Sequence, residues 1–187
     1  MSAPSNSRQG RLGFAMPTIT LIGYRGTGKT TVAALLAEAL HAPWWDADVE
    51  LETRLGCSIS ALIGTRGEDL FRTEESATLA TLLDRTPGVL ATGGGVVIRP
   101  ENRSALAARG GLVVWLTATV EVVRRRLAID PTTLSRRPAL SGTDPLAEVA
   151  ATMLQREPWY RATAAMAIDT SHISPAEISR RILDRLA

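Results

Sequence analysis

The sequence predicts a three-layer α/β sandwich in which helices flank both faces of a central parallel sheet of about five strands. Three observations lead to this fold class. Short apolar runs alternate with helical stretches from residue 17 onward, which is typical of parallel strands joined by right-handed helical crossovers. The 187 residues are 45% hydrophobic and 21% charged, which suits one domain with a substantial core. No internal repeat is present, so we expect residues 17–187 to form a single domain.

The first part of the chain begins with an apolar strand and a long helix. Ile19, Leu21 and Ile22 lie in the expected strand, and an alanine- and leucine-rich helix is expected at 30–40 after a glycine-rich loop. A second short strand is expected at 43–45. Apolar residues at helical spacing then predict three helices, at 49–55, 58–63 and 67–84.

The second part repeats the alternation. A strand at 89–91, a helix at 102–108, a strand at 112–116 and a helix at 120–129 are expected in that order. Residues 130–145 form a long connection rich in Pro, Ser, Thr and Arg. A helix at 146–156 and a strand at 166–169 follow, and Ser174 is expected to cap the last helix, with Pro175 and Glu177 in its first turn.

The glycine-rich loop carries the only lysine of the chain, Lys29, although Lys and Arg together number 21. The segment Gly23-Tyr24-Arg25-Gly26-Thr27-Gly28-Lys29-Thr30 fits the phosphate-loop pattern G-x-x-x-x-G-K-[ST] between a strand and a helix. A compact ammonium reaches between phosphate oxygens where a planar guanidinium would crowd the loop. Glycines allow positive φ, so that backbone N–H groups and the helix N-terminus point at the anion. The loop therefore predicts a nucleotide phosphate site.

Two further motifs follow strands, and ligands collect at the carboxyl ends of parallel strands. We expect Asp46 and Asp48 to continue the second strand and point the same way, because residues two apart on an extended chain share a face. One carboxylate would then meet Mg²⁺ and the other would accept a proton from a hydroxyl; the alternative is a pair of helix N-caps. Gly93-Gly94-Gly95 would let the backbone approach a ligand, or would form an ordinary turn.

Three arginines are candidates for anion binding, although in a chain with this many arginines each would usually be surface charge: Arg72, Arg137 and Arg156. Arg137 differs because Arg136-Arg137-Pro138 lies in the long polar connection, the kind of segment that becomes an active-site lid. A lid arginine can stabilise charge on a transferring phosphoryl group. The run at 124–126 is interpreted as a solvated helix face, with nucleotide contact as the alternative.

Composition limits the class of function. The formal net charge of +2 indicates small anionic ligands rather than nucleic acid, and no apolar run is long enough to cross a bilayer. The single Cys57 excludes an internal disulfide, and the two histidines are too few to suggest a zinc centre. We expect a cytoplasmic protein without nucleic-acid or membrane partners. Residues 1–16 are interpreted as a disordered leader, with an organelle-targeting address as the alternative.

Taken together and in this order, the motifs resemble those of shikimate kinase, a family of P-loop small-molecule kinases. The resemblance runs from about residue 18 to the C-terminus and rests on several separate motifs: the loop at 23–30, Asp46-Ala47-Asp48, Phe71-Arg72-x-x-Glu75, Gly93-Gly94-Gly95, Arg137-Pro138 and Arg156-x-Pro158-x-Tyr160. It implies substrate-binding helices at about 48–84 and a lid at about 130–145.

The resemblance also implies roles for the individual residues. ATP phosphates would bind to Lys29, to the lid residue Arg137 and to the remaining loop residues Gly26, Thr27, Gly28, Thr30 and Thr31. Mg²⁺ would be held by Thr30 and Asp46. Shikimate would bind to Asp48 as candidate base, to Arg72 and Arg156 as a carboxylate clamp, with Glu75 orienting Arg72, and to the backbone of Gly93, Gly94 and Gly95.

The implied reaction converts ATP and shikimate into ADP and 3-phosphoshikimate, a step toward chorismate and the aromatic amino acids, and a monomer is expected. The sequence departs from many family members after the last strand, where Ser171-His172-Ile173 replaces an adenine-contacting arginine. Either Arg125 or Arg126 could stack on adenine. The alternatives are another small-molecule P-loop kinase, acting on gluconate or a nucleotide, and a nucleotide-dependent regulatory or nucleic-acid module.

Overall fold

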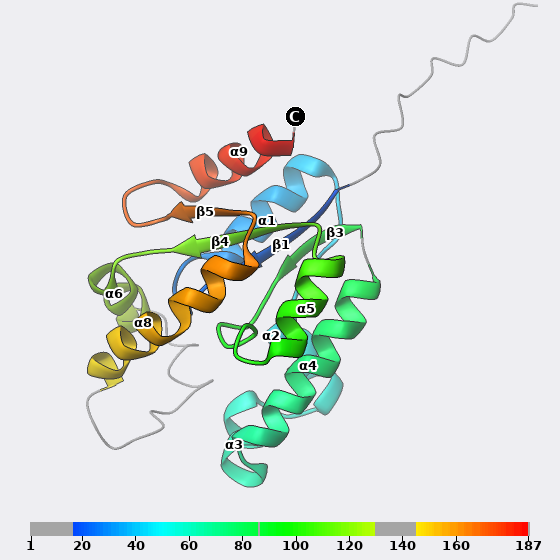
Figure 1. The fold of residues 1–187 in the computed structure, drawn as a ribbon, viewed down its shortest axis with the longest axis vertical. Helices are drawn as coiled ribbons and strands as arrows, with labels where there is room; N and C mark the ends of the chain where they lie inside the picture. The colour runs from blue at the N-terminus through cyan, green and yellow to red at the C-terminus, as the bar shows by residue number, and fades with distance from the viewer. Residues whose placement is uncertain (1–16, 86, 130–144, 187) are drawn as a thin grey trace, which may run out of the picture.

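The computed structural model describes residues 17–85, 87–129 and 145–186. The expected leader at 1–16 and most of the expected lid, including Arg137, lie outside the described residues. Within them, five parallel strands form one sheet in the order β2-β3-β1-β4-β5 (Figure 1). The strands are β1 (Thr18–Ile22), β2 (Trp44–Asp46), β3 (Gly88–Ala91), β4 (Leu112–Thr117) and β5 (Met166–Asp169).

Helices cover both faces of this sheet, which confirms the predicted three-layer α/β class (Figure 1). One face carries α1 (Lys29–Leu40) and α9 (Pro175–Leu186). The other carries α4 (Glu68–Asp84), α5 (Pro100–Arg109) and α8 (Pro145–Thr163). The remaining helices pack on these: α2 (Ala47–Leu55) and α3 (Ile59–Arg66) against α4, and α6 (Val120–Ile129) against α8.

The central strand β1 shows why the expected strands are so apolar. Ile19 and Leu21 pack into the core beneath α1 and α9, whereas Ile22 packs into the core beneath α4, α5 and α8. All three side chains have an exposed fraction of 0%. Because both faces of a parallel sheet are covered, successive residues of a central strand are all buried. This packing fixes β1 and directs the loop that follows it to the carboxyl edge of the sheet.

Most element boundaries agree with the expectations, and the helix at 120–129 and the strand at 166–169 match residue for residue. Ser174 caps the last helix as expected, since its hydroxyl accepts the N–H of Glu177 at 3.2 Å. The expected end of one helix at 156 is wrong, because α8 continues through Pro158 to Thr163. That continuation places Arg156 and Tyr160 one turn apart on the same helix.

The placement of the Asp46-Ala47-Asp48 segment on an extended strand is also wrong. Strand β2 ends at Asp46 and α2 begins at Ala47. The physical reason is a side-chain cap: Asp46 Oδ1 accepts the N–H groups of Asp48 and Val49 at 3.0 and 3.3 Å, which starts the helix immediately. Asp48 therefore projects from the first turn of α2.

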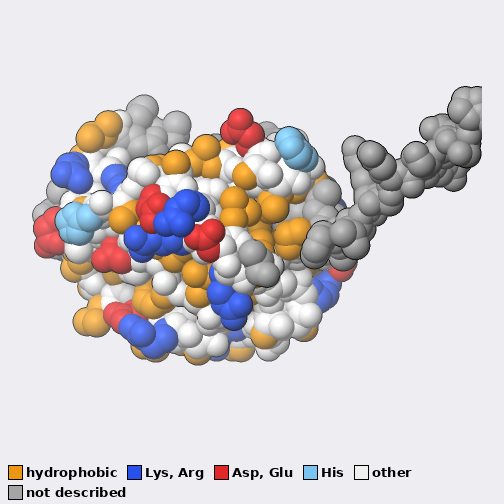
Figure 2. Space-filling model, turned by 90° about the horizontal axis from the view of Figure 1, so that it is seen from above, with side chains coloured by type: hydrophobic (Ala, Val, Ile, Leu, Met, Phe, Trp, Pro, Cys, Tyr) orange, Lys and Arg blue, Asp and Glu red, His pale blue; other side chains and the backbone are white. Residues whose placement is uncertain are grey.

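The face over α9 carries interleaved charges of both signs rather than a basic stripe (Figure 2). Arg180 pairs with Glu177 at 2.9 Å and with Asp184 at 2.8 Å, and Arg181 also pairs with Glu177 at 2.8 Å. Such mixed pairing offers no continuous track for a phosphate backbone. Among the described residues, no helix is long and apolar enough to span a membrane.

Candidate active site

The phosphate loop joins β1 to α1 at the carboxyl edge of the sheet. Gly28 is the N-cap of α1 and has a left-handed φ of 92°, which a side chain would strain, and no side chain caps the first N–H groups. Lys29 is 8% exposed, and its Nζ donates to the carbonyl oxygens of Gly23 and Tyr24 at 2.8 and 2.9 Å. The ammonium thus lies beside open N–H groups, the arrangement that favours an anion.

The first turn of α1 meets the end of β2. Thr30 Oγ1 donates to Asp46 Oδ2 at 2.7 Å, so the two predicted metal ligands are in direct contact. Asp46 uses its other oxygen to cap α2. A hydroxyl beside one carboxylate oxygen is the donor set that Mg²⁺ takes next to nucleotide phosphates, with water and phosphate completing the octahedron. Thr31 is exposed in the same turn of α1.

The three glycines after β3 are required for space rather than for a left-handed backbone, since none has a positive φ. A Cβ at Gly93 would lie 2.7 Å from Asp48 Oδ1 and 2.8 Å from Glu75 Oε1. A Cβ at Gly94 would lie 3.1 Å from the backbone nitrogen of Arg25 in the phosphate loop, and one at Gly95 would collide with the guanidinium of Arg72. Each glycine therefore leaves space for a neighbouring group of the predicted site, and Gly93 leaves space for two.

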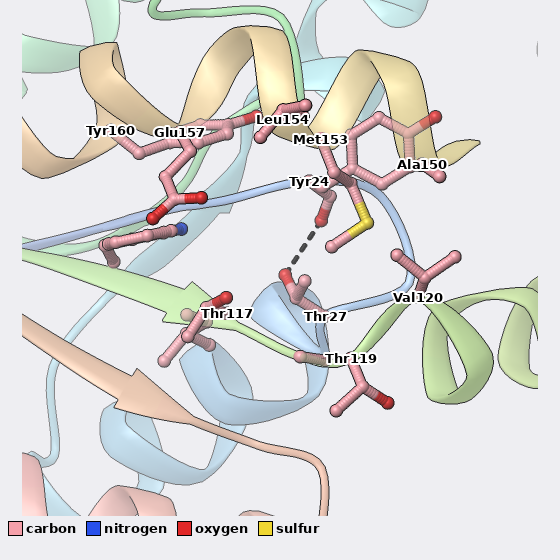
Figure 3. A pocket seen from close by; sticks show the side chains of 13 residues that line it. Tyr24, Thr27, Thr117, Thr119, Val120, Ala150, Met153, Leu154, Glu157 and Tyr160 are labelled. Atoms are coloured by element: carbon pink, nitrogen blue, oxygen red, sulfur yellow. Dashed lines mark hydrogen bonds between the residues drawn. The ribbon is translucent and has the colours of Figure 1, made fainter. Parts of the chain in front are cut away.

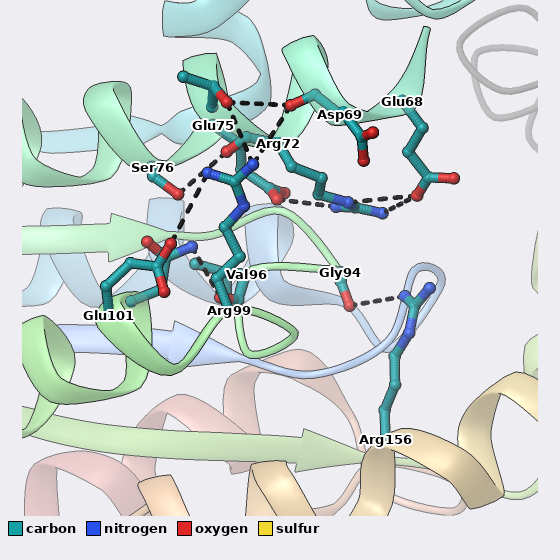
Figure 4. A network of polar contacts seen from close by, with 12 residues as sticks. Glu68, Asp69, Arg72, Glu75, Ser76, Gly94, Val96, Arg99, Glu101 and Arg156 are labelled. Atoms are coloured by element: carbon teal, nitrogen blue, oxygen red, sulfur yellow. Dashed lines mark hydrogen bonds and ion pairs between the residues drawn. The ribbon is translucent and has the colours of Figure 1, made fainter.

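Arg72 is held in a buried network on α4 (Figure 4). Its Nη1 donates to Glu75 Oε2 at 2.7 Å, and its Nη2 and Nε donate to Glu68 Oε1 at 2.8 and 3.2 Å. Burial alone lowers the pKa of Arg72, but the charge of Glu75 and the hydrogen bonds to Glu75 and Glu68 raise it overall. The guanidinium is thus charged and fixed in one orientation, as the motif Phe71-Arg72-x-x-Glu75 predicted.

Arg156, on α8, reaches the glycine triplet (Figure 4). Its Nη1 donates to the carbonyl oxygen of Gly94 at 3.0 Å, and its guanidinium carbon lies 5.9 Å from the centre of the Tyr24 ring. Three side-chain atoms around the glycine triplet and the phosphate loop are buried without a hydrogen-bond partner among the described residues: Arg25 Nε, Glu75 Oε1 and Arg156 Nε. Buried polar groups in this condition usually bind a ligand or water.

The sequence profile of the shikimate kinase family matches residues 25–187. The chain belongs to the shikimate kinase family. It is 44% identical to the shikimate kinase of Rhodopirellula baltica over 163 residues, which cover 87% of each protein. It is 43% identical to the shikimate kinase of Syntrophus aciditrophicus over 175 residues, which cover 89% of each.

Solved structures give the same family. The shikimate kinase from Acinetobacter baumannii in complex with shikimate superposes with a TM-score of 0.85 at 35% identity, covering 92% of this chain and 93% of that one. A gluconokinase from Sinorhizobium meliloti reaches a TM-score of 0.54 at 20% identity, which is a likeness of fold alone. The comparisons thus favour shikimate kinase over the gluconate-kinase alternative.

Arg126 lies between the phosphate loop and the segment that follows β5. Its guanidinium donates to the carbonyl oxygen of Gly26 at 3.2 Å and to the hydroxyl and carbonyl oxygens of Thr170 at 3.0 and 2.7 Å. Arg125 is exposed. The interpretation of 124–126 as a solvated face is therefore wrong for Arg126, which ties the phosphate loop to the segment after β5. Spacing alone could not distinguish the two arginines.

The structure also shows aromatic contacts around Arg156 to which the sequence motifs gave no role. The Tyr24 ring of the phosphate loop has its centre 5.7 Å from the guanidinium carbon of Arg25 and 5.9 Å from that of Arg156. Thr27, a predicted phosphate contact, directs its hydroxyl to the carbonyl oxygen of Tyr24 at 2.8 Å and is fully buried, so its side chain braces the loop. Tyr160 was named only as part of the motif Arg156-x-Pro158-x-Tyr160, and the signal for a role of its own is its spacing of four residues from Arg156.

A cavity of about 260 Å³ lies on the far side of Tyr24, between α8 and the end of β4 (Figure 3). Its walls include Thr27, Trp115, Met153 and Tyr160. Asp48, Arg72 and the glycine triplet do not line it. The cavity therefore borders the phosphate loop at Tyr24 and Thr27, and the candidate acceptor residues are not part of its walls.

Proposed function

We propose that the chain is a shikimate kinase that transfers the γ-phosphate of ATP to the 3-hydroxyl of shikimate, giving 3-phosphoshikimate and ADP. One observation carries the proposal: beside the phosphate loop, the three consecutive glycines lie against the carboxylates of Asp48 and Glu75, the second of which pairs with Arg72, and against the guanidinium groups of Arg72 and Arg156. A carboxylate suits a reacting hydroxyl, and planar guanidinium groups suit a carboxylate. A hydroxy acid next to a nucleotide phosphate satisfies both.

The phosphate loop supplies the ATP site in this proposal. Lys29 exchanges its bonds to loop carbonyls for phosphate oxygens, and the N–H groups from Gly26 to Thr31 surround the same charge. Arg137 of the expected lid is proposed to close over the phosphates. Arg126, rather than Arg125, is proposed to meet the adenine, because it already lies between the loop and Thr170.

The acceptor site lies across the glycine triplet. Asp48 is proposed to orient the 3-hydroxyl and take its proton, with Glu75 keeping Arg72 aimed at the shikimate carboxylate. Arg156 clamps the same carboxylate from α8. Proximity is the main contribution expected here, because phosphoryl transfer passes through a loose transition state in which positioning and electrostatics dominate.

Mg²⁺ is proposed to be held by Thr30 and Asp46, the aspartate through water. The contact between Thr30 Oγ1 and Asp46 Oδ2 supports this assignment, because it brings the two proposed ligands together at the first turn of α1. Bound Mg²⁺ would neutralise the charge that develops on the β- and γ-phosphate oxygens. Among the described residues no set of three acidic, histidine or cysteine side chains gathers, which suits a cation bound mainly by phosphate and water.

Asp46→Asn is expected to raise the Mg²⁺ concentration for half-maximal rate by about tenfold to a hundredfold. Asparagine caps helices as well as aspartate does, so α2 keeps its start while the charge is removed. Initial rates at saturating ATP and shikimate over a Mg²⁺ series measure the effect. Glu38→Gln, an exposed carboxylate near the other end of α1, is the control. An unchanged Mg²⁺ dependence would remove Asp46 from the metal site.

A coupled assay for ADP tests the proposed function directly. Shikimate, gluconate and nucleoside monophosphates are offered separately with Mg·ATP, and only shikimate is expected to be turned over. Phosphorylation of gluconate or a nucleotide with no reaction on shikimate would support the alternative of another small-molecule P-loop kinase.

The enzyme is further proposed to act as a monomer, because all its assigned residues come from one chain. Its single thiol, Cys57, is exposed and free, which suits the expected cytoplasm.

A further inference from the structure

Tyr160 is a buried polar side chain to which the proposed reaction assigns no role. It is 2% exposed and lies in the core between the sheet and α8. Its hydroxyl donates to the carbonyl oxygen of Gly94, the middle residue of the glycine triplet. A core residue needed only for packing could be phenylalanine, so the hydroxyl itself requires an explanation.

The same carbonyl oxygen accepts a second hydrogen bond. Arg156 Nη1 donates to it at 3.0 Å, and the two donors lie four residues apart on one face of α8. A carbonyl oxygen has two lone pairs, so both donors can be accommodated at once. Two side chains of α8 thus hold the Gly94 carbonyl, while the backbone of Arg25 in the phosphate loop packs closely against the Gly94 Cα.

The tyrosine is itself fixed by the sheet. Its ring stacks on that of Trp115 in β4, with centroids 5.8 Å apart and planes at 15°. Burial raises the pKa of Tyr160 to about 12 in spite of the nearby charge of Arg156. The hydroxyl therefore keeps its proton and remains a donor throughout the neutral range.

We propose that Tyr160 is a positioning residue for the acceptor site: it fixes the Gly94 carbonyl, and through it the guanidinium of Arg156 that faces the shikimate carboxylate. This inference rests on the proposed function and deepens it. The Arg156 side chain has several rotatable bonds, and a fixed acceptor for its guanidinium restricts them before the substrate arrives. Without the tyrosine hydroxyl, the Gly94 carbonyl that binds Arg156 is no longer held in one position. Shikimate binding therefore weakens, while ATP binding does not.

Tyr160→Phe keeps the ring and its stacking and removes only the hydroxyl. We expect the KM for shikimate to rise about tenfold, with kcat changed by less than about threefold and the KM for ATP unchanged. Thr163→Val is the matched control, because it removes a hydroxyl of α8 that donates only to its own helix, at the Trp159 carbonyl, at 2.7 Å. The control should leave both KM values at the wild-type level.

A double-mutant cycle with Arg156→Lys separates positioning from a merely structural effect. A lysine cannot bind Gly94 and a carboxylate as a planar fork, so Tyr160→Phe should change the shikimate KM by less than about threefold in that background. Equal rises in both KM values, or the full tenfold effect in the lysine background, would overturn the inference. Shikimate titration calorimetry at low temperature gives the same comparison if the variant melts early.

The outcomes distinguish this inference from the function on which it rests. Wild-type protein that fails to phosphorylate shikimate contradicts the proposed function. Wild-type turnover of shikimate, together with a Tyr160→Phe variant of unchanged shikimate KM, contradicts only the positioning role.

Discussion

Asp48→Asn is expected to lower kcat by about two to three orders of magnitude while leaving the affinity for ATP nearly unchanged. Asp48 lies against Gly93 in the first turn of α2, whereas the Lys29 ammonium donates to the carbonyl oxygens of Gly23 and Tyr24 in the phosphate loop. The amide can still hydrogen-bond a hydroxyl but cannot accept its proton. Steady-state rates with shikimate, and nucleotide titration in the absence of shikimate, measure the two effects separately.

The matched control is Glu50→Gln. Glu50 lies in the same first turn of α2, but its carboxylate pairs with Arg85 at 2.6 Å on the surface. Because exposed pairs contribute little to stability, this variant should keep wild-type kinetics. A fully active Asp48→Asn enzyme would eliminate Asp48 as the base, and a parallel loss in both variants would indicate damage to α2 instead.

Arg72→Ala is expected to raise the KM for shikimate by about a hundredfold and to change the KM for ATP little. The variant also leaves the Glu75 carboxylate buried without its partner, since the Arg72 and Glu75 side chains are 7% and 5% exposed. Breaking such a pair destabilises a protein by about 3 kcal/mol. Kinetics below the melting temperature and denaturant unfolding measure these two consequences.

Two other variants make the interpretation specific. Arg54→Ala removes an exposed ion pair between α2 and α4, the 2.6 Å contact of Arg54 with Glu74, and should change neither KM nor stability appreciably. Arg72→Lys keeps the charge near Glu75 but loses the planar fork, so its fold should be more stable than that of Arg72→Ala while shikimate binding stays weak. Equal increases in both KM values would contradict the carboxylate clamp.

The sequence was sufficient for the layers, the strand count and most of the site because these depend on local patterns. Apolar runs buried on both faces, as in β1, are recognisable without knowledge of their neighbours. The conformation of Asp46-Ala47-Asp48 could not be predicted correctly, because this segment can either extend the strand or start a helix, and the sequence is compatible with both. The cap formed by Asp46 Oδ1 overrode the extended strand and turned Asp48 onto a helix.

Other features depend on contacts between distant segments. Arg126 and Thr170 are 44 residues apart, and Tyr160 and Gly94 are 66 apart, so no window of the sequence contains either pair. The glycine triplet was predicted as a place of close approach, but the approaching groups are the protein's own Asp48, Glu75 and Arg72. Sequence indicates that such a position lacks a side chain, whereas only the packed structure shows what occupies the space.

The tight packing around the triplet limits how this enzyme could change by single substitutions. An alanine at position 95 would occupy the place of the Arg72 guanidinium, and one at position 93 would press on two carboxylates at once. Backbone strain is not the obstacle, since these glycines have ordinary φ values. Room for a side chain at either position must therefore come from a shift of Asp48, Glu75 or Arg72 or from a shorter residue in their place, so that any change at the triplet also changes the groups that α2 and α4 present to the acceptor site.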